Sequence, residues 1–555
     1  MTQEGIASRP AVSRSWTVIH SCAHGTGTHS QVRPAPTRPP PFPPHMPFSP
    51  IPLGHAIPDL PHAVSCSLPT MRAVCGYEVK APEVIAAMRG GYPRFVLHRF
   101  VKKLTDHYAK ACGSARYLWL TSSAQMAEQV RRELARSGHT AQVHDFDGID
   151  GVSHDDSPAI AQLARLFLQN TGGFLASRAA EDRLAQLGLV PAPQPEAAFG
   201  NGAPDRALVE IRRQLAPLFP ENSPDSLMLA PNGMNAVYAA FSALAEAQAA
   251  QGRHTWVQLG WLYLDTIALL KHHARDNAQH YCYLPDVFDL AALETLFAQR
   301  GAQIAGLVIE APTNPLIQTP DLPAIYTLAK KHGAAVIVDP SVSSIYSVDV
   351  LPYADVVCSS LTKYTASEGD LVAGLVVVNP HCANADSLHK SISTRLDPVY
   401  PRDLARLAHQ IAATPDVLAK VERSTATVAA WLEAHPSVKR VAWAHSPESR
   451  ANYQKLARHP DAVGGLISFT LRGPIEAFYD AVSLPKGPSF GMQTTLLCPF
   501  IYLAHYDLVT SEAGRRELAA SGLEPELLRL SVGCEPVEDL IAALDAALSQ
   551  APADG

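Results

Sequence analysis

Residues 305–340 read AGLVIEAPTNPLIQTPDLPAIYTLAKKHGAAVIVDP. A short apolar run at each end of this stretch encloses a helical pattern at 322–333 that ends at a glycine. Two more such runs follow, ADVVCSS at 354–360 and AGLVVVNP at 373–380. Nearly continuous apolar strands indicate a sheet that is buried on both faces. The alternation of strands and helices therefore predicts an α/β fold with a mostly parallel sheet covered by helices on both sides.

The composition is typical of a well-packed globular enzyme. A chain of 555 residues exceeds what one hydrophobic core organises, so at least two domains are expected. Hydrophobic residues make up 47 % of the chain, and 45 basic against 52 acidic side chains give a formal net charge of −7. This balance makes no case for binding to nucleic acid or to a membrane. No apolar run reaches the length of a membrane span or a signal core, so a cytoplasmic location is expected.

The cysteines and histidines do not suggest a metal. Nine cysteines are scattered without a CxxC pair or a Cys/His cluster at zinc spacing. We therefore expect reduced thiols, and no metal site is predicted.

The N-terminus differs from the rest of the chain. Between Pro34 and Pro61, twelve of 28 residues are proline, which predicts a disordered or polyproline-like tail over residues 1–61. Glu4 is the only acidic residue before Asp59, so a transit-like peptide is one alternative. A second alternative is that the residues before Met46 are a translated leader and that the protein has an internal start at Met46.

Changes in pattern along the chain suggest further boundaries. After the tail come a turn-rich entry with a basic helix, a small α/β module, a large domain with the apolar strands, and a smaller α+β domain. Their predicted limits are residues 62–112, 113–205, 206–380 and 381–555. The last domain contains the strand candidates VKRVAWA, GGLISFTL and LLRLSVG and a final helix, PVEDLIAALDAALS.

Polar residues follow three of the predicted strands at the point where each ends. Asn314 follows the first run, Asp339 ends the second, and Lys363 comes three residues after the third. Ligands of open parallel sheets bind beyond the carboxyl ends of the strands, so these residues are candidates for a site. Because a buried carboxylate needs a partner, an ordinary salt bridge between Asp339 and Lys363 is the simplest alternative.

The neighbours of this pair favour a cofactor over a salt bridge. Ser360 and Thr362 closely precede the lysine, and PNGMN at 231–235 opens a helix. Pyridoxal phosphate requires an amine for a Schiff base, a carboxylate for its ring nitrogen, and N–H and hydroxyl donors for its phosphate. The chain offers all three in order, which predicts a pyridoxal phosphate site.

At these motifs the sequence resembles the Cys/Met-metabolism pyridoxal-phosphate enzymes, which include cystathionine γ-synthases, cystathionine lyases and O-acylhomoserine sulfhydrylases. The residues that carry the resemblance are EAPTNP, VIVD, ADVVCSSLTKY followed by GDLVAG, the NGM helix start, and LLRLSVGCEPVEDLI. Their order and spacing over residues 225–548 make the match specific. The resemblance implies the type I fold of pyridoxal-phosphate-dependent transferases, with a large domain and a smaller C-terminal domain.

The resemblance also implies roles for individual residues. Lys363 would form the Schiff base and move protons during catalysis, and Asp339 would pair with the ring nitrogen. The implied phosphate ligands are Gly233, Met234, Ser360 and Thr362, while Asn314 corresponds to a side chain that touches the ring hydroxyl.

Three further positions follow from the same resemblance. Tyr263 corresponds to a catalytic tyrosine stacked on the cofactor ring, although Leu264 and Asp265 replace the usual glycine pair. A tyrosine of the core is the alternative there. Arg529 corresponds to the arginine that binds the substrate carboxylate through a bidentate pair, and Ser489 to a serine beside it.

GYPRF at residues 91–95 resembles a Tyr-x-Arg element that reaches into a neighbouring subunit and binds the cofactor phosphate there. The resemblance thus implies that residues 62–112 form an N-terminal arm with Tyr92 and Arg94 as ligands, in a homodimer or homotetramer. Phe95 and the three residues after it stand where the family has Asn-Pro-Thr. A surface turn is therefore the alternative.

Residues 113–205 separate this element from the NGM helix, whereas the family usually joins them within a few dozen residues. With LPHAVSCSLPT and NTGGFLASRAAE, this arrangement resembles a longer, fungal-type cystathionine γ-synthase branch. The implied reaction is γ-replacement on an O-acylhomoserine with cysteine, giving cystathionine in methionine biosynthesis. An O-acylhomoserine sulfhydrylase, a cystathionine or methionine lyase, and a cofactor-binding but catalytically silent homologue are the alternatives. The sequence leaves open the acyl group, the sulfur donor, the oligomer size and the role of residues 113–205.

Overall fold

The structure is a computed structural model that describes residues 48–113, 116–202 and 204–550. The transit-like peptide and the internal start at Met46 lie outside the described residues. Among the helices that the structure describes, none combines the length and the apolar character needed to cross a membrane. The cytoplasmic location stays a prediction.

A seven-stranded sheet organises the large domain. In spatial order its strands are β6 (Met228–Ala230), β12 (Gly374–Val378), β11 (Val356–Ser360), β10 (Ala335–Asp339), β9 (Ile304–Glu310), β7 (Thr255–Leu259) and β8 (Tyr281–Leu284). Along the spatial run β8-β7-β9-β10-β11, neighbouring strands pair in parallel. Strand β12 is antiparallel to both of its neighbours, β11 and β6. The four apolar runs of the sequence are β9 to β12, so these predicted strands and the mostly parallel sheet are confirmed.

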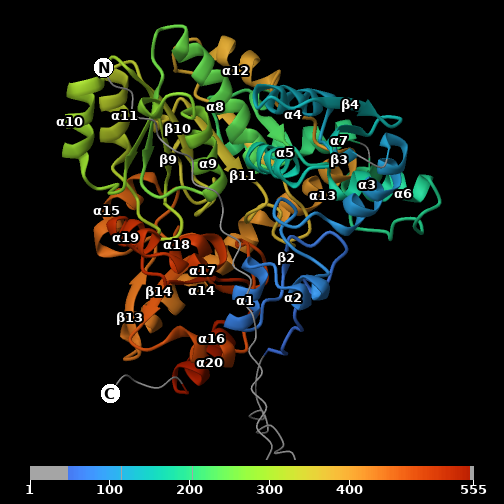
Figure 1. Cartoon of the computed structure of the whole chain (residues 1–555). Coiled ribbons are helices and arrows are strands. Elements are labelled where there is room, and N and C mark those ends of the chain that lie inside the picture. The colour runs from blue at the N-terminus through green and yellow to red at the C-terminus, as the bar shows by residue number, and fades with distance from the viewer. Residues whose placement is uncertain (1–47, 114–115, 203, 551–555) are drawn as a thin grey trace, which may run out of the picture. The chain divides into compact units, whose positions relative to one another are not determined.

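Helices cover both faces of this sheet, as Figure 1 shows. One face packs against α8 (Gly233–Ala249), α9 (Leu264–His273) and α12 (Ala385–Ser393). The other packs against α7 (Pro204–Leu215), α10 (Leu290–Arg300), α11 (Leu322–Lys331) and α13 (Pro401–Gln410). In β9, Leu307 faces the second core and Val308 the first, which explains why the strand has no polar alternation.

The boundary predicted at residue 380 needs correction. Apolar residues of α12 and α13, such as Ile392 and Leu407, belong to the two cores of the large sheet. These helices therefore cover the large domain, and the smaller domain begins near α14 (Thr414–Ala434).

The C-terminal domain is an antiparallel sheet packed with helices. Its strands, in spatial order, are β13 (Val438–Ala442), β14 (Leu466–Leu471), β16 (Leu528–Ser531) and β15 (Leu496–Pro499). The helices are α14, α15 (Pro447–Leu456), α16 (Ile475–Ala481), α17 (Phe500–Ala504), α18 (Tyr506–Thr510), α19 (Glu512–Ala520) and α20 (Val537–Leu548). The three strand candidates and the final helix of the sequence are present, while β15 was not predicted.

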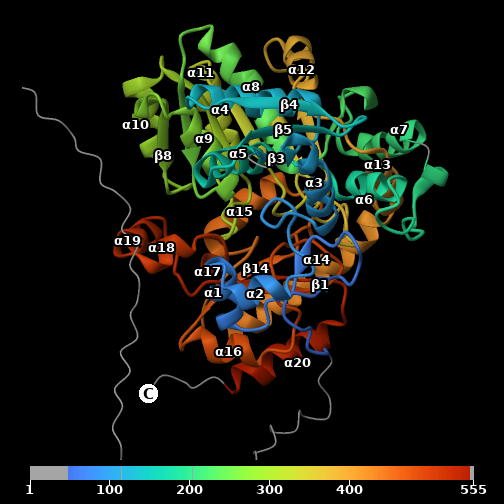
Figure 2. The ribbon, with the colours of Figure 1, turned by 45° about the vertical axis from the view of Figure 1, so that its right-hand side comes forward.

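The N-terminal arm packs on this domain. Its elements are β1 (Ala56–Ile57), β2 (Ser65–Cys66), α1 (Met71–Glu78) and α2 (Pro82–Ala87). Figures 1 and 2 show α1 beside α16 and α17, and Val74 joins the core of the C-terminal domain. Residues 48–61 fall within the predicted disordered tail, but Ile57 is buried and β1 pairs with β2. The prediction of a disordered tail is therefore wrong for residues 56–57, and residues 1–47 lie outside the described residues.

The inserted module is a three-stranded antiparallel sheet between two pairs of helices. Its elements are α3 (Arg99–Cys112), β3 (Arg116–Leu120), α4 (Ala124–Arg136), β4 (Ala141–Asp145), β5 (Asp150–Asp155), α5 (Pro158–Thr171) and α6 (Ser177–Gln186). The strand order is β3-β5-β4, and β5 was not predicted. Leu104 of α3 shares a core with Leu118 of β3 and Leu184 of α6, so the module begins at α3 rather than at residue 113. It lies against the large domain, with α5 next to α8 and α9 (Figures 1 and 2).

Candidate active site

The carboxyl ends of β9, β10 and β11 meet at one edge of the large sheet, beside a cavity of about 360 Å³. Asp339 and Glu310 are partners in the register of β10 and β9, and Ser360 ends β11. Every residue predicted for the site lines this cavity except Thr362. Parallel register alone thus brings together three strand ends that are far apart in the sequence.

Lys363 places its amine in the cavity. Nζ donates to Ser489 Oγ at 2.7 Å and lies 4.7 Å from the centre of the Tyr92 ring. Burial, and to a lesser degree two nearby arginines, lower the pKa of Lys363 well below its ordinary value. No carboxylate pairs with Lys363 in the described part of the chain, so the simple salt bridge with Asp339 is not formed. The lowered pKa favours the neutral amine, which is the form that acts as a nucleophile or a base.

Two carboxyl groups lie together at the floor of the cavity. Burial raises the pKa of Asp339 to about 6, although the Ser341 backbone N–H donates to Asp339 Oδ1 at 2.8 Å and counteracts this. Burial and the charge of Asp339 raise the pKa of Glu310 well above its ordinary value. The Glu310 carboxyl accepts from the backbone N–H of Tyr263 at 2.5 Å and of Asn314 at 3.3 Å. Sequence reasoning missed Glu310, although it ends β9 just as Asp339 ends β10.

The start of α8 lies against Ser360. Gly233 and Met234 are the first residues of this helix, so their backbone N–H groups have no carbonyl partner within it. A Cβ on Gly233 would come within 2.9 Å of Ser360 Cβ, so only glycine allows this approach. N–H groups and a hydroxyl at a helix N-terminus suit an anion such as phosphate.

Thr362 is not among the residues that line the cavity. Its hydroxyl donates to Ala373 O at 3.3 Å and accepts from Ala373 N at 3.1 Å. The Thr362 hydroxyl joins the turn after β11 to the start of β12, and its role as a phosphate ligand stays a prediction.

Arg529 projects from β16 on the opposite side of the cavity. It donates to Asn314 Oδ1 and to the Ser489 carbonyl, both at 3.0 Å, and its guanidinium lies 4.6 Å from the Phe500 ring centre. Arg529 Nε is buried and has no hydrogen-bond partner among the described residues. A buried donor without a partner is costly, so the guanidinium is suited to an incoming carboxylate.

Ser489 holds a strained conformation between Lys363 and Arg529. Its φ of 82° lies in the left-handed region, which non-glycine residues rarely adopt. Gly491, two residues later, has φ of 71°, and a Cβ there would come within 2.8 Å of the backbone nitrogen of Tyr364. Residues 489–491, Ser-Phe-Gly, are thus packed against the turn that carries Lys363.

Tyr263 closes the cavity together with Arg94. Arg94 Nη2 donates to the Tyr263 hydroxyl at 2.6 Å, and Arg94 Nη1 donates to Asp265 Oδ2 at 2.5 Å. Gln169 Nε2 donates to the other Asp265 oxygen at 2.8 Å, and the Gln169 carbonyl accepts from Arg94 at 3.2 Å. Burial raises the pKa of Asp265, and the charge of Arg94 offsets this. The aspartate in place of a glycine therefore anchors the arginine.

Tyr92 and Arg94 line the cavity in this single-chain structure, and the expectation that they reach a neighbouring subunit stays a prediction. Both side chains are buried, and Arg94 Nε has no partner among the described residues. Gln169, which contacts Arg94, was not predicted. No sequence motif around Gln169 marks it as a site residue, because its position at the cavity depends on how α5 packs on the large domain. Among the described residues, no group of three or more His, Cys, Asp and Glu side chains could hold a metal ion.

Comparison with known proteins agrees with this site. A sequence profile described as "Cys/Met metabolism PLP-dependent enzyme" matches residues 211–549, more than half of the chain. The chain belongs to this family. It is a pyridoxal-phosphate-dependent enzyme of the cystathionine γ-synthase-like group, with the type I fold.

Two relatives and one solved structure illustrate the similarity. An L-2-amino-4-chloropent-4-enoate dechlorinase/desaturase from Streptantibioticus cattleyicolor is 38 % identical over 87 % of this chain and 95 % of its own length. A cystathionine gamma-synthase from Neurospora crassa is 34 % identical over 59 % of this chain and 52 % of its own length. The crystal structure of cystathionine gamma synthase from Xanthomonas oryzae pv. oryzae in complex with cystathionine has a TM-score of 0.53 and 25 % identity, covering 67 % of this chain and 96 % of that chain.

Proposed function

We propose that the cavity binds pyridoxal phosphate at Lys363 and that the enzyme breaks a bond to the γ carbon of an L-α-amino acid. The observation that carries the proposal is the buried amine of Lys363, which has no carboxylate partner among the described residues and lies at the same strand edge as the Asp339 carboxyl. When bound, pyridoxal phosphate supplies an aldehyde that condenses with amines and a ring that takes up electron density from the substrate α carbon.

The donors and acceptors of the cavity fit this cofactor. In the proposal, Asp339 keeps the ring nitrogen protonated, and Asn314 contacts the ring hydroxyl. The helix start at Gly233 and Met234 binds the phosphate, with the Ser360 hydroxyl beside it.

Three more residues complete the cofactor site in this proposal: Tyr263, just before α9, and Tyr92 and Arg94 of the N-terminal arm. Tyr263 stacks on the ring, while Tyr92 and Arg94 extend the phosphate site. The buried and unpartnered Arg94 Nε provides a further donor.

Lys363 and Arg529 have different roles toward the substrate in this proposal: Lys363 transfers protons, and Arg529 binds the α-carboxylate. Loss of a γ substituent requires protons to be taken from the α and β carbons, and the lowered pKa of Lys363 favours the neutral amine that accepts them. Arg529 binds the α-carboxylate, using Nε and the donors that now bond to Asn314 and Ser489. Ser489 keeps the amine in place through its hydroxyl.

The names of the relatives point to the same carbon. In L-2-amino-4-chloropent-4-enoate, the chlorine is on C4, the γ carbon of the amino acid. The similarity to that dechlorinase/desaturase covers 95 % of its length, which supports loss of the γ substituent without replacement as the first candidate. The cystathionine gamma-synthase from Neurospora crassa supports a second candidate, γ-replacement on an O-acylhomoserine by cysteine to give cystathionine.

Product analysis of the reconstituted protein separates the candidates. We would offer L-2-amino-4-chloropent-4-enoate and O-acetyl-, O-succinyl- and O-phosphohomoserine, each alone and with cysteine or sulfide. Release of the γ substituent without a thiol supports elimination, while thiol-dependent release with a thioether or homocysteine product supports replacement. O-acetylserine, which has its leaving group on the β carbon, is the matched control. A protein that binds the cofactor but releases nothing from any γ-substituted substrate would refute the proposal and indicate a catalytically silent homologue.

A further inference from the structure

We infer that Asp370 is a positioning residue for Lys363: a buried ion network around Asp370 fixes the turn that carries the lysine, and the inserted module supplies part of that network. The inference rests on the proposed function in taking Lys363 as the residue that binds the cofactor. It gives a role to the GDLVAG motif at residues 369–374, which contains Asp370 and which the proposed function leaves without one.

The turn that carries Lys363 depends on support from outside. It consists of residues 361–373, which contain no helix or strand and lie between the end of β11 and the start of β12. Tyr364, directly after the lysine, has φ of 63°, in the left-handed region that non-glycine residues rarely adopt. A turn without regular backbone pairing takes its conformation from the groups that bond to it, so these groups decide where Lys363 lies.

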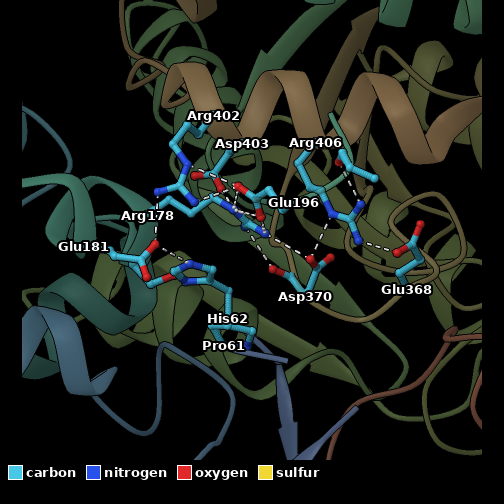
Figure 3. A network of polar contacts seen from close by, with 12 residues as sticks. Pro61, His62, Arg178, Glu181, Glu196, Glu368, Asp370, Arg402, Asp403 and Arg406 are labelled. Carbon is cyan, nitrogen blue, oxygen red and sulfur yellow. Dashed lines mark hydrogen bonds and ion pairs between the residues drawn. The ribbon is translucent and has the colours of Figure 1, made fainter. Parts of the chain in front are cut away.

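Asp370 is the most heavily bonded side chain of this turn (Figure 3). It is 4 % exposed, and its Oδ2 accepts from Arg406 Nε at 2.9 Å and from Arg178 Nη2 at 3.0 Å. Its Oδ1 accepts from Gln410 Nε2 at 2.7 Å, and its backbone carbonyl accepts from Arg178 Nη1 at 3.0 Å. Because the loss of any of these bonds would leave a buried charge or donor without its partner, Asp370 has one strongly favoured position.

Helix α13 holds the turn at a second point. Arg406 Nη2 also donates to the Glu368 carboxylate, and the Glu368 backbone N–H donates to Gln410 Oε1 at 3.1 Å. Arg406 and Gln410 are four residues apart, so they lie on one face of the helix. Leu407 of the same helix shares the core of the large sheet with Leu371 of the turn. Helix α13 thus fixes the turn through both polar and apolar contacts.

The inserted module completes the ion network from the other side (Figure 3). Arg178 of α6 is 1 % exposed, and besides Asp370 it pairs with Asp403 of α13 at 3.0 Å and with Glu196 at 2.8 Å. Glu196 also pairs with Arg402 of α13 at 2.8 Å. The same buried arginine therefore docks the module on α13 and holds the turn of Lys363.

The network acts on Lys363 from outside the cavity. Asp370, Arg406 and Gln410 do not line the cavity, and Asp370 follows Lys363 by seven residues. At the other end of the turn, the Tyr364 backbone N–H donates to the Gly491 carbonyl at 2.7 Å. Lys363 therefore lies between two fixed points. A displacement of about 1 Å in a reacting group can slow a reaction about 100-fold, so release of one fixed point should impair the amine.

A matched pair of variants tests this role. Asp370→Asn and Asp403→Asn each remove one negative charge that pairs with Arg178, but only Asp370 lies on the turn. We would add pyridoxal phosphate to the full chain freed of cofactor and follow its capture by stopped-flow visible absorbance. Asp370→Asn should slow capture about 10- to 100-fold, whereas Asp403→Asn should stay close to the parent. Equal capture rates in the two variants would overturn the inference, because the network would then serve stability alone.

A second variant covers the case in which Asp370→Asn does not fold. Gln410 is 2 % exposed and bonds to Asp370 and to the Glu368 backbone, but it carries no charge, so Gln410→Met leaves the arginine pairs of Asp370 in place. It should slow capture less than Asp370→Asn, but measurably. Gln248→Met is its control, since Gln248 is also buried and donates to the Gly333 carbonyl away from the cavity. Capture by Gln410→Met at the parent rate would overturn the inference.

Hydrogen exchange keeps this test separate from the proposed function. Mass spectrometry of the cofactor-free full chain measures the exchange of backbone amides in peptides that cover residues 361–373. Asp370→Asn should raise the exchange rate in these peptides, and Asp403→Asn should not. Unchanged exchange in Asp370→Asn would overturn the inference. Failure of the parent protein to capture any cofactor would instead refute the proposed function, while the exchange still reports whether Asp370 fixes the turn.

Discussion

Two walls of one cavity are built in different ways. The strand wall carries Asp339, Ser360 and Lys363, which lie within 25 positions of each other and are placed by the register of adjacent strands. The arm wall carries Arg94 and Gln169, which meet Asp265 from 171 and 96 positions away in the sequence. In the proposed function the strand wall provides the chemistry, whereas the arm wall depends on buried ion pairs that dock one segment on another. The following predictions separate these two contributions.

The largest effect is expected on the strand wall. Lys363→Ala should remove covalent cofactor binding and lower turnover by roughly a thousandfold or more, because one residue supplies both the nucleophile and the proton-transfer group. The readouts are the visible absorbance of the purified protein and the rate of leaving-group release. Lys486→Met is the matched control, since Lys486 is also buried and has its pKa lowered to about 8, but does not line the cavity. Equal loss in both variants would mean that the amine of Lys363 has no special role.

Loss of the buried ion pairs of Arg178, which does not line the cavity, should weaken the arm wall and so lower both stability and cofactor retention. Arg178→Met leaves Asp370 and Asp403 buried without their partner and should destabilise the fold by about 3–5 kcal/mol. Denaturant unfolding measures the change, and cofactor retention should fall with it. Lys455→Met removes a half-exposed pair with Asp321 and should have little effect on either. A stable Arg178→Met protein with normal cofactor binding would break the proposed link between docking and the site.

Arg529 of β16, which lies across the cavity from the strand wall, tests the binding of the substrate. Arg529→Lys keeps the charge but loses the planar pair of donors, so KM for the amino acid should rise by about 10- to 100-fold with a smaller change in kcat. Steady-state kinetics on the best γ-substituted substrate gives the two constants. A fall in kcat at unchanged KM would indicate that Arg529 acts on the reaction rather than on carboxylate binding.

The smallest effect is a shift in pH dependence. Because burial and neighbouring arginines lower the pKa of Lys363, cofactor capture by the protein freed of cofactor should already be fast near neutral pH. Arg529→Gln removes one of these positive charges, so the pKa of Lys363 should rise and the midpoint of the capture rate should move to higher pH, by about one unit or less. Stopped-flow absorbance across pH measures the shift. Movement to lower pH would contradict the assigned cause.

The sequence predicts the strand wall well because its geometry is local. Apolar runs become the strands, and the polar residue at each strand end necessarily reaches the same edge, as Asp339 does. Thr362 shows the limit of this reasoning, since the identity of a hydroxyl does not say that it bonds to Ala373.

The arm wall could not be predicted in the same way. Pairing of Arg94 with Asp265 depends on where the module docks, and that is decided by buried pairs such as Arg178 with Asp403, 225 positions apart. We also predicted the domain limits from changes in the sequence pattern. A helix belongs to the domain on whose core its apolar face packs, and for α3 and α13 that core lies on the other side of the predicted limit.

Borohydride reduction of the holoenzyme, followed by peptide mapping, tests the central claim most directly. The account predicts one pyridoxyl group per chain, on the Lys363 side chain. Its presence on Lys486 or on another lysine, with Lys363 unmodified, would contradict the assignment of the site and of every role built on it.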